Sequence, residues 1–269
     1  MCYFVDAMAY TSTDHASSSR PAKARAVRLS ESFNRGARRV RAELAPLADP
    51  MPSRSAPTAS NHALTGLALG ASATGLLLLS RVALRPQPSP LDVALTRLLQ
   101  RRYVPWLTRG MTLISVPGFA PLQFALVAGT ALDQWAFGRR REALFTTLTM
   151  GAGAITGVIK IAVGRPRPDP SYMRVVFQFR DNSFPSGHCT HYAAFYGYLF
   201  YLARRGMAPS PLRVALQAAC LGLVATVAPS RVYLGHHWAS DVLGGELVGL
   251  TYLFALIRAY ERVWVRPAS

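Results

Sequence analysis

The sequence predicts an all-α membrane protein, a polytopic bundle of six transmembrane helices that follows a poorly ordered basic N-terminal tail. Apolar residues make up 51% of the 269 residues and are gathered into long runs without charge. Lys and Arg number 30 against 13 Asp and Glu, which gives a net charge of +17. This balance fits an anionic membrane surface or an anionic substrate. The apolar content argues against a nucleic-acid-binding protein, so we expect no nucleic-acid partner.

Six apolar runs predict the transmembrane helices. A bilayer core of about 30 Å takes roughly 20 apolar residues as helix, with about 17 as a practical minimum. The first three runs, of 19, 22 and 17 residues, reach this length, whereas the last three, of 16 residues each, need flanking residues to span. The alternative is a large soluble enzyme with six buried helices. The runs are His62 to Ser80, Met111 to Leu132, Ala143 to Ile159, His188 to Ala203, Val214 to Pro229, and Val242 to Ile257, the last broken by Glu246.

The first sixty residues differ in kind from the rest. They are rich in Ser, Ala and Arg, and the densest basic stretch is Arg35 to Glu43. No apolar segment follows a basic start, so the sequence predicts no cleaved signal peptide. We expect residues 1–60 to form a disordered tail, or in part a basic helix on anionic lipid, and residues 61–269 to form the membrane domain. Cys189 and Cys220 lie in apolar runs, where small core residues are expected.

The distribution of basic residues predicts the orientation. If all six runs span, the side that holds both termini carries 18 Lys and Arg, and the other side carries 12. The positive-inside rule then places both termini in the cytoplasm of an inner or plasma membrane. Polar His188, His191 and Glu246, which lie inside apolar runs, should face the bundle interior.

Three polar clusters lie in or beside the loops on the outer side. If these loops converge, their side chains share one pocket. The clusters are Lys160 followed by six residues and Arg167-Pro168; Pro185-Ser186-Gly187-His188; and Ser230-Arg231 followed by five residues, His237, three residues and Asp241.

The residue types in these clusters suit binding of a phosphoryl group. Catalysis of phosphoryl transfer is mostly positioning and stabilisation of negative charge on the transferred group. Lys160, Arg167 and Arg231 supply charge-assisted donors, and the arginine fork suits bidentate contact with phosphate. Ser186 supplies a hydroxyl at the start of a predicted helix, and Gly187 lets a backbone amide approach an oxygen closely.

Two histidines and a carboxylate supply the remaining parts of such a reaction. A histidine held in one tautomer by a carboxylate can act as a nucleophile. His237 and Asp241 are four residues apart, which places them on one helical face. His188 can protonate the leaving oxygen and later activate water. His236 is the neighbouring competitor to His237 and is separated from it only by motif spacing.

In this order, the three clusters resemble the signature motifs of the type 2 phosphatidic acid phosphatase superfamily. The resemblance spans Lys160 to Asp241 and implies a membrane phosphatase acting on a lipid phosphate, with no metal or other cofactor. It implies that His237 forms a phosphohistidine, that Asp241 orients it and that His188 is the general acid. The implied phosphate ligands are Lys160, Arg167, Ser186, Gly187 and Arg231.

Other functions remain open from the residues alone. A transporter or pore could bind an anion in transit without hydrolysis, although transporter sites lie near the midplane rather than at helix ends. Vanadate-dependent halide oxidation would use the same pocket, but the haloperoxidases of this superfamily are soluble and much larger. His188 and His191, with His236, His237 and Asp241, could instead hold a metal.

Several nearby residues have a simpler interpretation. Arg165 and Arg174 are expected to be solvated loop residues, and Trp238 an anchor at the membrane interface. Glu246 is expected either to pair with an arginine or to face a polar interior.

Overall fold

The computed structural model describes Glu31 and residues 59–264, with side chains at Glu31 and residues 66–262. The tail predicted over residues 1–60 therefore lies almost wholly outside the described residues. Every regular element in the described part of the chain is helical, which confirms the predicted fold class. The helices are α2 (Ala59–Ala83), α3 (Pro90–Leu99), α4 (Pro105–Ser115), the 3-10 turn η2 (Val116–Gly118), α5 (Ala120–Ala136), α6 (Arg140–Leu148), α7 (Gly151–Val163), α8 (Gly187–Gly206), α9 (Pro211–Tyr233) and α10 (Ala239–Trp264).

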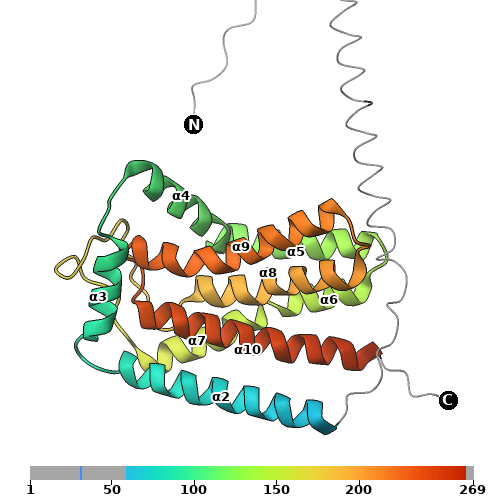
Figure 1. Ribbon diagram of the computed structural model, residues 1–269, viewed down its shortest axis with the longest axis horizontal. Helices are drawn as coiled ribbons and strands as arrows, with labels where there is room; N and C mark the ends of the chain where they lie inside the picture. The colour runs from blue at the N-terminus through green and yellow to red at the C-terminus, as the bar shows by residue number, and fades with distance from the viewer. Residues whose placement is uncertain (1–30, 32–58, 265–269) are drawn as a thin grey trace, which may run out of the picture. The chain divides into compact units, whose positions relative to one another are not determined.

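Helix α8 is the interior helix of the bundle. It packs mainly on α9 and α10, between which it lies in Figure 1, while α2 flanks the far side of α10. Small residues let α8 and α10 approach closely. A Cβ added at Gly249 of α10 would lie 2.6 Å from the Cβ of Ala193, so this position has room only for glycine. The hydroxyl of Thr190 also donates to the backbone oxygen of Gly245 across the same contact, at 3.1 Å.

Among the described residues, four helical segments are long and apolar enough to cross a membrane: Gly66–Ala83, Arg140–Val163, Pro211–Tyr233 and Ala239–Arg262. Pro105–Gly118 and Ala120–Ala136 make a fifth if this pair, bent by 57°, counts as one span. All six predicted runs lie on helices, but two are interrupted: Met111 to Leu132 at η2, and Ala143 to Ile159 at Thr149 and Met150. The run that is absent from these candidate spans lies on α8. Its 20 residues correspond to about 30 Å of helix, but polar residues lower its hydropathy. Because α8 is surrounded by other helices, these polar residues need not face lipid.

The bend between α4 and α5 has a local cause in the sequence. Pro117 lacks a backbone N–H, so it cannot continue the hydrogen-bond ladder of a helix that precedes it. The chain forms one 3-10 turn, Val116–Gly118, before α5 begins at Ala120. The break brings Gly118 and Phe119 next to α8. A Cβ at Gly118 would lie 2.9 Å from the Nε2 atom of His188, so this glycine makes room for the histidine ring.

Candidate active site

The three polar clusters meet at one end of the bundle. Helices α7 and α9 end there, and α8 and α10 begin there, so the loops 164–186 and 234–238 share one region with α3 (Figure 1). A direct backbone contact joins two of the clusters, since the amide of Ser186 donates to the backbone oxygen of Asp241 at 3.0 Å. The predicted convergence of the motifs is therefore seen in the structure.

His237 lies at the centre of this region and is 1% exposed. Its Nε2 atom lies 3.1 Å from the NH1 nitrogen of Arg167. Because a guanidinium can only donate, Nε2 must accept, which leaves the ring proton on Nδ1. The Nδ1 atom faces Ser183 Oγ at 3.4 Å and Asp241 Oδ2 at 3.5 Å. Burial and the charges of Arg167 and Arg231 hold the pKa of His237 well below 6.5, so the ring is neutral at neutral pH.

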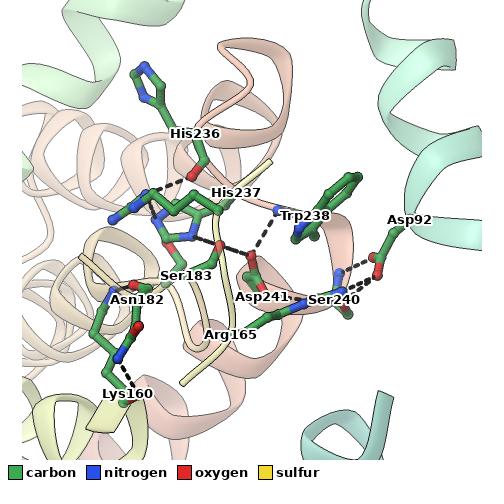
Figure 2. A network of polar contacts seen from close by, with 12 residues as sticks. Asp92, Lys160, Arg165, Asn182, Ser183, His236, His237, Trp238, Ser240 and Asp241 are labelled. Carbon is green, nitrogen blue, oxygen red and sulfur yellow. Dashed lines mark hydrogen bonds and ion pairs between the residues drawn. The ribbon is translucent and has the colours of Figure 1, made fainter. Parts of the chain in front are cut away.

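Asp241 is fully buried and lies in the first turn of α10. Its carboxylate accepts hydrogen bonds from the Ser183 hydroxyl, from the Trp238 amide at 2.9 Å and from Arg165 at 2.6 Å (Figure 2). The bond from Trp238 is half of a capping box, in which a first-turn acid satisfies an unpaired amide at the helix start. His237 precedes α10, so the expected placement of both residues on one helical face is corrected to a loop residue facing the first turn.

Arg165 is a residue whose role the sequence did not reveal. The expectation of a solvated loop residue is wrong, because Arg165 is 3% exposed. Its guanidinium donates to Asp241 and to Ser240 Oγ, and on its other side it donates to Asp92 Oδ2 at 2.8 Å. Asp92 belongs to α3 and also accepts from the Ser240 amide at 2.8 Å. Arg165 therefore joins α3 to the start of α10 directly behind Asp241.

Trp238 also differs from its expected place at the membrane interface. It is 4% exposed, and the Arg165 guanidinium lies 5.7 Å from the centre of its ring. Tyr172 also packs against the indole in an edge-on arrangement, with ring centres 6.0 Å apart. Trp238 thus covers the buried ion pairs of Arg165 from solvent. Arg174, in contrast, is exposed as expected and lies over the ring of Tyr103.

Lys160 and Arg167 lie side by side through a shared carboxylate. The Nζ atom of Lys160 is 3.0 Å from Asp181 Oδ2. The Nε and NH2 atoms of Arg167 both contact Asp181 Oδ1, at 3.0 and 2.7 Å. Burial alone would raise the pKa of Asp181, but the neighbouring Arg167 and Lys160 charges bring it below its ordinary value. Asp181 belongs to none of the three sequence clusters and lies five residues before Ser186.

Arg231 is buried in the last turn of α9, next to two aromatic rings. It is 1% exposed, and its guanidinium lies 5.6 Å from the ring centre of Phe119 and 5.7 Å from that of Phe179. Phe179 also lies under Arg167, at 4.7 Å, so the two arginines share one ring. The edge of His188 contacts Phe119 at 4.9 Å between ring centres. Arg231 and His188 therefore line the same region, on the side of the bend before α5.

Several buried polar atoms in this region have no hydrogen-bond partner in the described part of the chain. Such atoms are rare in folded proteins and mark strain or a site for a ligand. They lie on the start of α8, the end of α9 and the loop before α10, and every one belongs to a polar cluster singled out by sequence. The atoms are Ser186 Oγ, His188 Nε2, Arg231 Nε and NH1, and both ring nitrogens of His236.

His236 is distinguished from His237 by its surroundings. Its backbone oxygen accepts from Arg167 at 2.6 Å, and its ring packs edge-on against Phe179 with ring centres 4.9 Å apart. Figure 2 shows this ring turned away from Asp241. Burial and the nearby arginines lower the pKa of His236 to about 3. His236 thus lacks the carboxylate that faces His237.

His191 and Glu246, the other polar residues inside apolar runs, lie away from the residues around His237. His191 stacks on Phe195, with ring centres 5.4 Å apart. Glu246 is partly buried, and its Oε1 atom has no hydrogen-bond partner in the described residues. Within residues 66–262 no three His, Cys, Asp or Glu side chains are grouped as a metal site would require.

Comparison with known sequences finds a match to one protein family and several related proteins. Residues 142–264 match the model of the PAP2 superfamily. Phosphatidylglycerophosphatase B of Bacillus subtilis is 30% identical over 159 residues, which cover 58% of this chain and 76% of the relative. Lipid A 1-phosphatase of Rhizobium etli is 35% identical over 126 residues, which cover 44% of this chain and 50% of the relative.

Comparison with solved structures finds the same fold. The crystal structure of a transmembrane PAP2-type phosphatidylglycerolphosphate phosphatase from Bacillus subtilis matches with a TM-score of 0.64 and 24% identity, covering 74% of this chain and 98% of that one. The structure of Aquifex aeolicus LpxE matches with a TM-score of 0.52 and 20% identity, covering 63% and 96%. This chain is therefore an integral membrane protein. By its motifs, its fold and its relatives, it belongs to the PAP2 superfamily.

Proposed function

We propose that this protein hydrolyses a lipid phosphomonoester or diphosphate at the membrane interface, through a phosphohistidine on His237 and without a metal ion. The relatives are named as phosphatases, which supports activity as a phosphoric ester hydrolase. The lipid substrate is supported by the names of the relatives, a phosphatidylglycerophosphatase and a lipid A 1-phosphatase. The observation that carries the mechanism is the neutral His237 ring, with its proton toward Asp241 and its lone pair toward Arg167.

The phosphate group is proposed to lie against the Nε2 atom of His237. Arg167 already contacts this atom, Lys160 is tied to Arg167 through Asp181, and Arg231 shares the ring of Phe179 with Arg167. Three cations neutralise the charge of the transferred group without any ion from solution. Ser186 Oγ and the Gly187 amide add donors at the N-terminus of α8, where the helix dipole favours an anion.

The reaction proceeds in two steps. In the first, Nε2 of His237 attacks phosphorus, the bond from phosphorus to the ester oxygen breaks, and His188 protonates that oxygen. Asp241 stabilises the positive imidazolium that forms, because its carboxylate faces Nδ1. In the second, His188 takes a proton from water, which attacks the phosphohistidine. The bond from phosphorus to Nε2 then breaks and free phosphate leaves.

Ser183 supports this arrangement from the side. Its hydroxyl donates to Asp241 Oδ2 and lies 3.4 Å from Nδ1 of His237. Since Asp241 also accepts from Arg165 and the Trp238 amide, the carboxylate cannot rotate away from the histidine without losing these bonds. Asp241 is thus proposed to act as the orienting residue, and Arg165 and Ser183 to hold it in place.

The orientation in the membrane is proposed from charge. The side with both termini holds 18 Lys and Arg against 12 on the other, which favours cytoplasmic termini. With cytoplasmic termini, α7 and α9 both run toward the outer face. The site at the ends of these helices then lies on that face. Lys160, Arg167 and Arg231 on that face serve the substrate phosphate, so their presence does not oppose the rule.

Phosphate release by the purified protein in detergent tests the proposal. The substrates are phosphatidic acid, phosphatidylglycerol phosphate, a polyprenyl diphosphate and phosphorylated lipid A. The wild type should release phosphate from at least one of these substrates, and His237→Ala should release it from none. His236→Ala should retain most of the wild-type rate. A transporter or pore would release none. Full activity of His237→Ala would contradict the mechanism.

A further inference from the structure

Asp181 forms ion pairs with two of the cationic side chains that the proposed function assigns to the substrate phosphate, Lys160 and Arg167. It lies in the loop between α7 and α8, and its side chain is 56% exposed. One carboxylate oxygen accepts from Lys160 at 3.0 Å, and the other accepts from Arg167 Nε and NH2 at 3.0 and 2.7 Å. This geometry, one oxygen on an arginine fork and the next on an ammonium group, is also how these side chains contact phosphate oxygens.

Little donor capacity remains on these cations while Asp181 is in place. The NH1 group of Arg167 is directed to the His236 backbone oxygen and to Nε2 of His237, and its Nε and NH2 atoms contact Asp181. The Lys160 ammonium donates to Asp181 and to the backbone oxygen of Asn182. A phosphate that reaches Nε2 of His237 must therefore take over donors that Asp181 holds.

We propose that Asp181 is a resident counter-anion, which the substrate phosphate displaces from Lys160 and Arg167 when it binds. The inference rests on the proposed function, since it takes these two residues as phosphate ligands. Asp181 keeps the paired cations neutralised and aligned between turnovers. It weakens phosphate binding by competition, and it assists release of the product phosphate by returning to the same donors.

The local structure allows the carboxylate to move while the loop stays in place. The residues on either side are fixed by other contacts. Asn182 Nδ2 donates to the backbone oxygen of Lys160 at 2.9 Å, and the amide of Ser183 donates to the backbone oxygen of Arg165 at 2.7 Å. The Asp181 side chain is more than half exposed, so it can rotate into water without uncovering a buried surface. A rotation of this side chain removes the carboxylate from both cations, while Lys160 keeps its bond to the Asn182 backbone oxygen and Arg167 Nε keeps its bond to the Asp181 backbone oxygen.

Direct binding of inorganic phosphate to the full-length protein in detergent, measured by calorimetry, tests the inference without requiring turnover. Asp181→Asn keeps the size of the side chain but removes its charge, and it should bind phosphate about tenfold more tightly, as expected from the loss of two partly exposed ion pairs. Asp181→Glu should bind as the wild type does. Asp169→Asn is the matched control, because Asp169 is an exposed acid of the same loop whose carboxylate accepts from the Ser171 amide rather than from Lys160 or Arg167. It should leave phosphate affinity unchanged.

The kinetic constants provide a second readout. Asp181→Asn should lower KM for a short-chain phosphatidic acid and raise product inhibition by phosphate, which loss of a merely structural residue would not do. Equal or weaker phosphate binding by Asp181→Asn would overturn the inference. If Asp181→Asn failed in this way but Arg167→Ala still abolished phosphate binding, the role of Asp181 would be wrong and the proposed function would still hold. A wild type that binds no phosphate would overturn both.

Discussion

Replacing Arg165 with Ala tests the buried network that holds Asp241. Arg165 is 3% exposed, and its two carboxylate partners, Asp92 and Asp241, are 2% and 0% exposed. The substitution leaves both carboxylates buried without their cation. Removing one partner of a buried pair costs about 3–5 kcal/mol, because the remaining charge is uncompensated. We therefore expect the free energy of unfolding of Arg165→Ala to fall by about this amount.

The same substitution should change catalysis without changing substrate binding. Arg165 reaches Asp241 from the side opposite to His237, so it is expected to make no contact with the phosphate. A displaced orienting carboxylate of this kind costs about 10- to 100-fold in rate. The prediction is thus a lower kcat with KM within about twofold of the wild type, measured by phosphate release.

Two controls separate the network from a general loss of stability. Arg174→Ala removes an exposed arginine of the same loop, and its cost should stay below about 0.5 kcal/mol. Asp92→Asn removes one of the two carboxylates. The double variant with Arg165→Ala should be less destabilised than the sum of the single variants, by about 1–3 kcal/mol. A free energy of unfolding for Arg165→Ala within about 1 kcal/mol of the wild-type value, together with an unchanged kcat, would show that Arg165 does not hold Asp241 in place.

Three further predictions follow from the same structure. Orthovanadate, which can adopt the trigonal-bipyramidal shape of the transition state, should inhibit phosphate release, and chelators should have no effect; restoration of chelated enzyme by Mg²⁺ would contradict a site built from Lys and Arg. The pKa values of His236, about 3, and His237, well below 6.5, mean that acid protonates the unfolded chain but not the folded one. Unfolding experiments should therefore show a loss of about 1 kcal/mol for each of these two histidines between pH 6.5 and 5.5, and His236→Gln should reduce the total loss by about 1 kcal/mol; a flat pH series would contradict this. In intact cells, a cysteine at Ser171 should react with a membrane-impermeant thiol reagent and one at Ser210 should not; the reverse pattern would place the site on the cytoplasmic face.

The apolar runs predicted the helices well, because charge-free stretches of this length are distinctive. The sequence was less informative about where a run is interrupted. Met111 to Leu132 was treated as one run, whereas the structure bends it by 57° at Val116–Gly118. Pro117-Gly118 was a visible signal for this break. Helix α3 lies in a linker that carried no motif, so its contribution to the site through Asp92 was not predicted.

The motif residues converged as expected, but their supporting contacts did not follow from the sequence. Arg165 contacts Asp92, 73 residues away, and Asp241, 76 residues away. Neither pair has a periodic spacing that reasoning from one sequence can detect. An arginine in a loop is usually solvated, and only the meeting of α3, α10 and the loop after α7 buries this one. The same holds for Asp181 and Phe179, whose partners come from three different segments.

The most direct test of the account is to trap the covalent intermediate. The wild type should be incubated briefly with a lipid substrate labelled with ³²P in the phosphate, quenched in alkali and digested. Acid-labile, base-stable label is expected on the peptide that contains His237, and none in His237→Ala. His236→Ala should retain the label. Label on His236, on a serine or on no residue while phosphate is being released would contradict His237 as the nucleophile.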